Sequence, residues 1–434
     1  MSFPHEPGCG SKAFAMDLTR VHKTDDLVRR LSHEEDPDRI IRTFAGYDQH
    51  GLARDGVVTV SRRGLPAPQY KITRSSLWKE RINPWANPEK LPIFQRGILG
   101  ELLYAGKPAI VDGFELRDDD PAREYLEGVQ SIVCVPTYDR GEALNMAMLL
   151  RRAPPCFTAQ DLESMLLNAN LVSRAVNNAL LAGQVREAYQ KLDREMQRVG
   201  EMQRQLLPAS LPVIEGLQLA ARYVTCSRAG GDYYDVFRLD ERHWGLCIGD
   251  VSGHGTPAAV VMAMLHTLVH TLPAASQSPG AVLSHINRHM TAMVPDGMFA
   301  TAIYAVYDSD TQTLRYANAG HPIPRCRRRG QIVPLPHVPG LPLGVSDMEN
   351  WPEQEFQLQR DDMLVFYTDG LVEGMNPSGE QFGTQRLERA LHALPAEPAQ
   401  VVEHLDRHHQ EFCAGTVSMD DRTLLVAVAR EHKQ

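Results

Sequence analysis

The sequence lacks three features that would each assign a protein to a large class. It has no CxxC cysteine pair, no basic surplus, and no apolar run of the roughly 18 residues that a membrane span needs. The formal net charge of -9 argues against a nucleic-acid partner, because basic residues must displace the counterions of the phosphate backbone. The seven cysteines are scattered, and the N-terminal MSFPHEPGCGSK has no apolar core like that of a signal peptide. We therefore expect a cytoplasmic protein with reduced cysteines and with no nucleic-acid or membrane partner.

The length predicts two domains and a connector, because 434 residues exceed what one ordinary hydrophobic core holds together. Hydrophobic residues make up 43% and charged residues 23% of the chain, as in soluble globular proteins. The first 20 residues are polar and carry glycine and proline, which is typical of a flexible tail. We expect an α/β domain over residues 21–158, a helical linker over 159–207 and a second domain over 208–434.

The first half mixes helical and strand patterns. The patterns are a helical spacing at Ile40, Ile41 and Phe44, a strand VVTVS at 57–61, a helix running into a strand at 92–114, and two strands in SIVCVPTYDRGEALNMAMLLRR joined by a turn at 139–141. With the helical FTAQDLESMLLNANLVSRAVNNALL after them, these stretches resemble a GAF domain. The resemblance implies a sensor for a small ligand or a partner protein, and no motif names that ligand.

A long helix is predicted next, beginning after the N-cap residue Thr158 and reaching Leu207 before a proline, with one weak point at Gly183. Apolar residues repeat along it at alternating steps of three and four, which is a heptad seam, and the seam is locally overwound between Val199 and Leu206. Two interpretations are open. The helix lies on its own domain, or it forms a parallel dimeric coiled coil, which its length and its charged flank favour.

The second half is a run of strands interrupted by grouped helices. The strands are LQLAARYV, YDVFRLD, HWGLCIGDV, ATAIYAVYD, TLRYANAG, DMLVFYTDG and DRTLLVAVA, and the helices are at 256–272, at 278–294, in GTQRLERALHAL and in AQVVEHLDRHHQEFC. This order indicates an α+β domain or a layered αββα domain. A basic run from Arg325 to Arg329 is interpreted as the solvated tip of a hairpin.

Four acidic positions in this half stand at strand ends, most of them beside glycine. They are Asp232 in GGDYYD, Asp250 in GDVSGHG, Asp369 in YTDG, and Asp420 or Asp421 in DDRTLLV. A single aspartate at a strand end is usually a turn or cap residue. Four of them in one β-rich domain indicate an oxygen-lined site for divalent cations, because close negative charges are tolerable only when cations neutralise them.

The motifs that carry these residues resemble those of bacterial metal-dependent phosphatases of the SpoIIE/RsbU type, which are similar to PP2C serine/threonine phosphatases. They are GEMQRQLLPASLP, AGGDYYDVF, GDVSGHGTPAAVVMAM, MFATAIYAVYD, YANAGHPIP, LPLGV, MLVFYTDGLVE and DDRTLLV, in the family's order and over residues 200 to 430. The resemblance implies an αββα sandwich of two antiparallel sheets flanked by helices. It also implies a pair of Mn²⁺ or Mg²⁺ ions at one edge of the sandwich.

The same resemblance assigns roles to individual positions. Asp232 and Asp250 match the ligands nearest a metal-bridging water, and the Val251 carbonyl matches a backbone ligand. Asp369 and Asp420 match the acidic ligands from later strands, with Asp421 expected to support the site from behind. The implied reaction is direct hydrolysis of phosphoserine or phosphothreonine by that water, which fits the absence of a GxSxG or CxxxxxR motif.

The family resemblance also implies a partner and a form of regulation. The expected substrate is a phosphorylated STAS-type antagonist of an anti-sigma factor. The expected regulation runs from the GAF-like domain to the metal site through the helix of a homodimer. The alternative function is a non-catalytic signalling scaffold whose phosphatase-like domain binds a partner without hydrolysis.

Four further residues near the motifs have open roles. His254 is either a catalytic acid or a turn residue, and Arg228 is a candidate for holding the substrate phosphate. His321 in NAGHP is expected to support the site by hydrogen bonding and not to react. Asp235 is expected beside the metal ligands without binding a metal itself.

Overall fold

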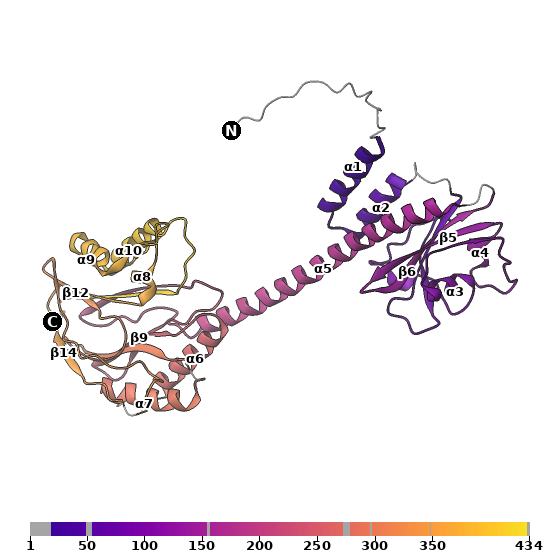
Figure 1. Cartoon of the computed structure of the whole chain (residues 1–434). Helices are drawn as coiled ribbons and strands as arrows, with labels where there is room; N and C mark the ends of the chain where they lie inside the picture. The colour runs from indigo at the N-terminus through magenta and orange to yellow at the C-terminus, as the bar shows by residue number, and fades with distance from the viewer. Residues whose placement is uncertain are drawn as a thin grey trace, which may run out of the picture. The chain divides into compact units, whose positions relative to one another are not determined.

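A computed structural model of the chain describes residues 19–48, 54–153, 157–271, 278–295, 297–347 and 349–431. The contacts divide the chain into two compact units, residues 1–189 and 190–434, with the boundary inside one long helix (Figure 1). Of the flexible tail predicted over residues 1–20, residues 1–18 lie outside the described residues. Helix α1 begins at Thr19.

Two expectations drawn from missing sequence features are tested by the structure. Within the described ranges, no helix is both long and apolar enough to cross a membrane. The cysteines that the structure describes, at positions 134, 226, 247, 326 and 413, are all free. Cys9 and Cys156 lie outside the described residues.

The first unit is built on a six-stranded antiparallel sheet in the order β3-β2-β1-β6-β5-β4. The two strands predicted at 131–152 are confirmed, and the turn between them has positive φ angles at Arg140 and Gly141. Strand β2 was not predicted from the sequence. The strands are β1 (Gly56–Ser61), β2 (Tyr70–Ser75), β3 (Ile93–Phe94), β4 (Ala109–Asp112), β5 (Ser131–Asp139) and β6 (Glu142–Arg151).

Helices cover both faces of this sheet. One face packs in a core with α3 (Ile98–Ala105) and α4 (Arg123–Leu126), and a short 3₁₀ turn, η1 (Pro88–Lys90), precedes β3. The other face packs on the start of α5 (Ala159–Arg204), through residues such as Met165 and Ala169. Helices α1 (Thr19–His33) and α2 (Pro37–Asp48) pack on the next part of α5.

Helix α5 is the long helix that the sequence predicts, and it runs unbroken through Gly183. Its N-terminus has a capping box, in which Thr158 Oγ1 accepts from the Asp161 amide while the Asp161 carboxylate accepts from the Thr158 amide. The residues at 165, 169, 172 and 176 are buried on the first unit, so for this part the helix does lie on its own domain. Farther along, Val185 and Tyr189 are 54% and 69% exposed.

The second unit consists of two five-stranded antiparallel sheets, in the orders β14-β11-β10-β9-β8 and β13-β12-β15-β16-β7. The strands of the first sheet are β8 (Tyr233–Arg238), β9 (His243–Val251), β10 (Ala300–Asp308), β11 (Thr313–Ala319) and β14 (Gln354–Gln357). Those of the second sheet are β7 (Leu217–Val224), β12 (Arg325–Arg328), β13 (Gln331–Val333), β15 (Met363–Tyr367) and β16 (Arg422–Ala429).

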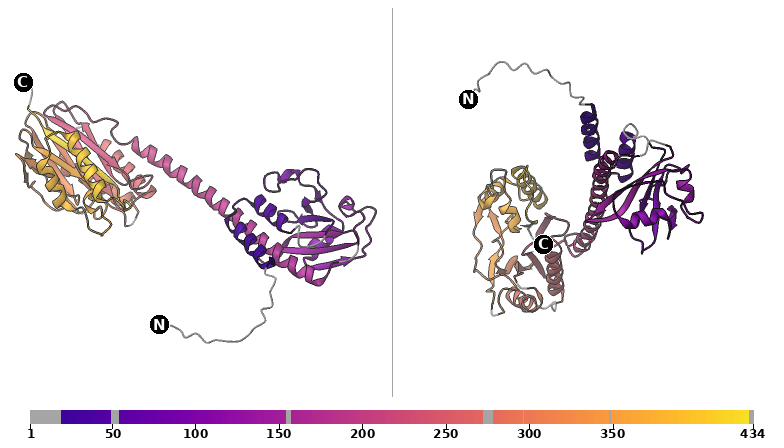
Figure 2. Two further views of the ribbon diagram at one scale, coloured as in Figure 1. Left: turned by 90° about the horizontal axis from the view of Figure 1, so that it is seen from above. Right: turned by 45° about the vertical axis from the view of Figure 1, so that its right-hand side comes forward.

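The two sheets of the second unit pack face to face, and helices cover their outer faces (Figure 2). Helices α6 (Thr256–His270) and α7 (Pro279–Met293) cover the first sheet, with a core that includes Met262 and Ile286. Helices α9 (Gly383–Ala393) and α10 (Pro398–Phe412) cover the second sheet, and the short α8 (Asp369–Glu373) follows β15. The predicted αββα layering is therefore confirmed in this unit.

The basic run forms the predicted hairpin, β12 and β13, with positive φ angles at Arg329 and Gly330 in its turn. Its description as a solvated tip is wrong for most of its arginines. Arg327 is only 9% exposed and donates to backbone carbonyls at the end of α9, while Arg328 forms an ion pair with the buried Asp362. These guanidinium groups are used within the fold and are not presented to a polyanion.

Candidate metal centre

The first two predicted ligands lie at the same end of two neighbouring strands. Asp232 comes directly before β8, Asp250 is the second-last residue of β9, and these strands pair antiparallel with Tyr233 opposite Gly249. The start of one strand in such a pair lies beside the end of the other. The structure thus brings together two residues that are separated by a whole hairpin in the sequence.

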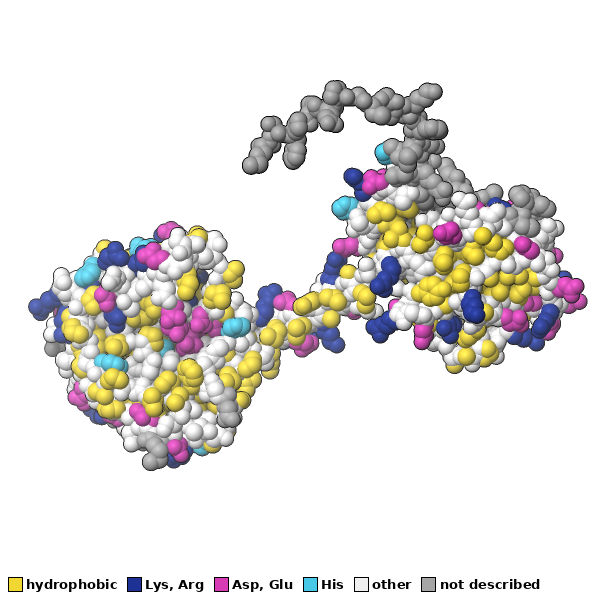
Figure 3. Space-filling view, viewed as in Figure 1, with side chains coloured by type: hydrophobic (Ala, Val, Ile, Leu, Met, Phe, Trp, Pro, Cys, Tyr) yellow, Lys and Arg dark blue, Asp and Glu magenta, His cyan; other side chains and the backbone are white. Residues whose placement is uncertain are grey.

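The other two predicted ligands have the same arrangement on the second sheet. Asp369 follows the end of β15, Asp420 precedes the start of β16, and these strands pair with Tyr367 opposite Leu424. Asp250, Asp369 and Asp420 are all partly exposed, and Figure 3 shows acidic side chains gathered on one face of the second unit. Each sheet therefore contributes two carboxylates to the centre.

Asp232 connects the two sheets at this end of the sandwich by hydrogen bonds. Its side chain is 1% exposed, and its Oδ2 accepts hydrogen bonds from Thr368 Oγ1 at 2.8 Å and from Thr423 Oγ1 at 2.6 Å. Both threonines belong to the second sheet, next to Asp369 and next to the start of β16. Sequence reasoning missed them, although each stands in a motif, YTDG and DDRT, that it had singled out.

The four carboxylates interact electrostatically, and their pKa values are all raised. Burial, followed by the charges of Asp232, Asp369 and Asp420, raises the pKa of Asp250 far above its usual range. Burial and then the Asp420 charge raise the pKa of Asp369 to about 6, and burial also raises the pKa of Asp420 and Asp232. Four carboxylates that oppose one another's ionisation need a cationic neighbour to be charged together.

The centre also contains an unsatisfied acceptor. Asp369 Oδ1 is buried and has no hydrogen-bond partner among the described residues. A buried carboxylate oxygen without a donor is costly unless a cation takes the donor's place. An all-oxygen set with such an atom fits Mg²⁺ or Mn²⁺, which prefer carboxylate, carbonyl and water ligands.

Asp421 has a different place from its neighbour Asp420. Its side chain is 1% exposed, and its two oxygens accept the backbone amides of Cys226 and Gly231, at 2.8 and 2.5 Å. Gly231 is also tightly enclosed, because a Cβ atom there would lie 2.6 Å from the Val251 carbonyl oxygen. Asp421 thus holds the loop before Asp232 close to the backbone carbonyl that the sequence predicts as a ligand.

The two histidines of the motifs differ in their surroundings. His321 is 3% exposed, its Nδ1 lies 2.9 Å from Thr301 Oγ1, and burial lowers its pKa to about 3, so the ring is neutral. Thr301 pairs with Asp250 across β9 and β10, which places His321 behind that ligand. His254 is exposed and near enough to Asp420 to oppose, in small part, the rise that burial causes in the pKa of that carboxyl group.

The loop before Asp232 is held by the last turns of α5. Gln203, only 4% exposed, donates to the Gly230 carbonyl and accepts from the Gly230 amide at 2.9 Å. Arg228, a candidate for binding phosphate, instead forms two hydrogen bonds with Asp193 of α5, at 2.9 and 3.2 Å. Sequence reasoning missed Gln203, and its heptad pattern gives no signal for a polar contact at that position.

Asp235 does not lie among these ligands. It is 6% exposed, and its carboxylate accepts from Tyr233 and contacts His270 of α6. The alternation of β8 explains this, because the side chains at 233 and 235 point towards α6 while those at 234 and 236 point into the space between the sheets. The expectation that Asp235 supports the metal ligands directly is therefore wrong.

A sandwich of two antiparallel sheets between helices, with carboxylates from both sheets at one end, is the architecture of PP2C-type domains. In fold, the chain is similar to the SiaA-PP2C domain of Pseudomonas aeruginosa, with a TM-score of 0.50 and 20% sequence identity over 56% of this chain and 99% of that one.

The sequence comparison identifies the domain more closely. Residues 240–430 match the family described as Stage II sporulation protein E (SpoIIE), so the likeness to this family lies within the second unit. Two relatives from Bacillus subtilis (strain 168) are similar to the chain. Phosphoserine phosphatase RsbU is 31% identical to this chain, over 45% of this chain and 58% of RsbU. Phosphoserine phosphatase RsbP is 28% identical, over 42% of this chain and 45% of RsbP. The chain thus spans about half the length of these relatives.

Proposed function

We propose that this chain is a Mn²⁺- or Mg²⁺-dependent phosphatase that hydrolyses phosphoserine or phosphothreonine on a partner protein. The observation that carries the proposal is the meeting of four electrostatically interacting carboxylates, two from each sheet, at one end of the sandwich, where one oxygen of Asp369 is unsatisfied. The two Bacillus relatives are both named phosphoserine phosphatases, which supports the same activity.

Asp232, Asp250, Asp369, Asp420 and the Val251 carbonyl would hold two ions. When bound, such ions lower the pKa of a shared water and offset the charge of the phosphoryl group. The protein's part is to fix the carboxylates before the substrate arrives. The two threonine hydroxyl groups on Asp232 and the backbone amides on Asp421 hold the centre in one arrangement, which lowers the reorganisation needed during the reaction.

The proposed substrate is a phosphorylated STAS-type antagonist of an anti-sigma factor. This rests on the likeness of the second unit to the SpoIIE/RsbU type. A phosphoserine on a folded partner has to reach a centre that is open to solvent, and three of the four aspartates are partly exposed. His254, which is exposed and near Asp420, would donate a proton to the departing serine oxygen.

The first unit is proposed to be a GAF-like sensor, and α5 to relay its state in a homodimer. Four exposed apolar residues, Leu181, Val185, Tyr189 and Leu192, follow one another at steps of four, four and three and are each more than half exposed. Such a row is typical of a coiled-coil seam. Because α5 ends on the loop before Asp232, a change in the packing of this seam can reach the metal centre through Gln203.

Release of phosphate from a phosphoserine form of a STAS protein, with and without Mn²⁺, tests the proposed activity. Asp250→Asn should lower the rate by on the order of 100-fold or more, because loss of even an outer partner of a metal site costs 10- to 100-fold. Asp310→Asn is a matched control, since Asp310 is an exposed residue that pairs with Arg242. Full activity of the Asp250 variant would refute the assignment of the centre.

The alternative is a scaffold that binds the phosphoprotein and releases no phosphate. The same assay distinguishes the two, because a scaffold leaves the phosphoprotein intact at every metal concentration. A single-residue insertion between Val199 and Leu206 tests the relay separately. It should change the rate of hydrolysis while Mn²⁺ binding is retained.

A further inference from the structure

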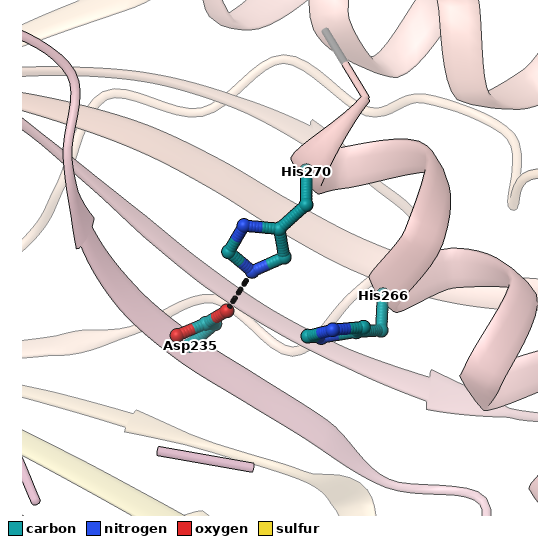
Figure 4. A group of neighbouring side chains, drawn as sticks. All are labelled: Asp235, His266 and His270. Atoms are coloured by element: carbon teal, nitrogen blue, oxygen red, sulfur yellow. Dashed lines mark hydrogen bonds and ion pairs between the residues drawn. The ribbon is translucent and has the colours of Figure 1, made fainter. Parts of the chain in front are cut away.

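A second group of metal-binding side chains lies on the outer face of the first sheet of the second unit. It consists of Asp235 of β8 with His266 and His270 of α6 (Figure 4). Each of the three residues offers one ligand atom, and these atoms all lie within 4.8 Å of one another. The two histidines are four residues apart, so they lie on the same face of the helix, one turn from each other.

Hydrogen bonds fix the carboxylate in this group. Asp235 Oδ1 accepts from the Val236 amide at 2.7 Å, while Oδ2 lies 2.9 Å from the Tyr233 hydroxyl and 2.6 Å from His270 Nε2. The Tyr233 hydroxyl is also 3.4 Å from His266 Nδ1. One carboxylate oxygen thus contacts His270 directly and is linked to His266 through the Tyr233 hydroxyl. The Val236 amide and the Tyr233 hydroxyl, which are not proposed as metal ligands, orient the carboxylate.

The carboxylate of Asp235 is buried and needs a neighbouring group that balances its charge. Asp235 is 6% exposed, and its carboxylate pairs with His270, whose side chain is 40% exposed. A buried carboxylate needs a cation, either a protonated histidine or a metal ion. Burial, followed by the neighbouring His270, lowers the pKa of His266, and this favours the neutral ring, which has a lone pair for a metal.

We propose that Asp235, His266 and His270 bind one transition-metal ion, with Zn²⁺ as the ion of best fit. Two imidazole rings and one carboxylate are a ligand set that suits zinc and related metals, whereas Mg²⁺ prefers oxygen ligands alone. The three residues would fill three coordination positions of the ion. Because His270, one of the three, is partly exposed, the fourth position is open to water. The site is distinct from the all-carboxylate centre, and it does not depend on the proposed phosphatase activity.

Two other helices carry histidine pairs with the same four-residue spacing as His266 and His270. His285 and His289 of α7 also lie one turn apart, with ring centroids 4.7 Å from each other. So do His404 and His408 of α10, with centroids 6.1 Å apart. Across the described part of the chain, only the pair on α6 has a carboxylate close enough to complete a group of three.

The position of the group gives a bound metal a structural effect. The ion would join α6 to β8. Helix α6 follows the loop after Asp250, and β8 follows Asp232 directly. A metal here would therefore link β8, which follows Asp232, to α6, which follows the loop after Asp250, and it should raise the thermal stability of the second unit.

Zinc binding to the full chain in the presence of excess Mg²⁺ tests the proposal. Zn²⁺ should occupy one site whose Kd rises at least about 100-fold in Asp235→Asn and in the double variant His266→Ala/His270→Ala. The matched control, His285→Ala/His289→Ala, should bind like the unchanged chain. Equal zinc affinity in all four proteins would overturn the proposal.

A measurement on the unchanged chain guards against variants that fail to fold. Co²⁺ in place of Zn²⁺ should give the intense visible absorption of a four-coordinate ion with nitrogen ligands. Excess Mg²⁺ should leave that absorption unchanged, and one equivalent of Zn²⁺ should remove it. Only the weak absorption of six-coordinate, oxygen-bound Co²⁺ would overturn the proposal, whatever the phosphatase assay shows.

Discussion

Gln203→Ala should loosen the loop before Asp232 while leaving the four carboxylates in place. Gln203 is buried at the end of α5 and forms two hydrogen bonds with Gly230, one to its carbonyl and one from its amide. Removing the side chain breaks both bonds and leaves two backbone groups of Gly230 without a partner in a buried position. Each unsatisfied group costs about 1–3 kcal/mol, so we expect a total of about 2–6 kcal/mol for the two groups.

Hydrogen exchange of peptides that contain Gly230 measures this cost directly. A loss of about 2–6 kcal/mol corresponds to about 30- to 20,000-fold faster exchange of the protected amide, if the loop opens locally. The matched control is Gln197→Ala, because Gln197 is exposed on the same helix and bonds only to Glu201. If Gln203→Ala exchanges as slowly as the control and hydrolyses phosphate at the same rate, α5 does not act on the metal centre through this contact.

Two further predictions concern stability and the close contacts of the site. Burial and then Arg422 lower the pKa of His409 from 6.5 to about 4, so the unfolded state takes up a proton there before the folded state does. Stability should therefore fall as the pH drops from 6.5 to 4, by at most about 3 kcal/mol. His409→Gln should remove that part of the fall in urea unfolding, and the exposed His404→Gln should not. Gly231→Ala should weaken Mn²⁺ binding in calorimetry, because its Cβ would lie 2.6 Å from a backbone carbonyl. Gly183→Ala, in open space within α5, should leave Mn²⁺ binding unchanged.

The sequence was sufficient to predict the layers of the second unit and the residues at the carboxylate centre. Strand patterns place Asp232, Asp250 and Asp369 at strand ends, and in an antiparallel sheet such ends meet. The grouping of helices between strands left an α+β and an αββα domain open, the family resemblance implied αββα, and the structure confirms the αββα order. The assignment of metal-binding roles to these residues stays a prediction.

The contacts that the sequence could not give are those set by three-dimensional packing. Thr368 and Thr423 belong to the second sheet, and only the face-to-face packing of the sheets brings them to Asp232. Gln203 is one polar residue near the end of an amphipathic helix, and the heptad pattern gives no reason to bury it. The direction of the Asp235 side chain depends on which face of β8 packs against α6, and the GGDYYD motif alone does not show which face that is.

The heptad pattern of α5 had two interpretations, and the structure separates them along the helix. Met165, Ala169 and Val176 are buried against the first unit, as expected for a helix that lies on its own domain. Val185 and Tyr189 continue the same spacing and are exposed. A periodic apolar pattern predicts that a face is covered, but it does not distinguish a covering sheet from a second copy of the helix.

The central claim is that carboxylates from both sheets bind the same pair of metal ions. Calorimetric titration of Mn²⁺ into the full chain, Asp250→Asn, Asp369→Asn and the double variant tests it most directly, because each single change lies on a different sheet. We predict that either single variant loses the binding of the pair and that the double variant loses little more. Independent losses that add in the double variant, or unchanged binding in either single variant, would contradict the claim.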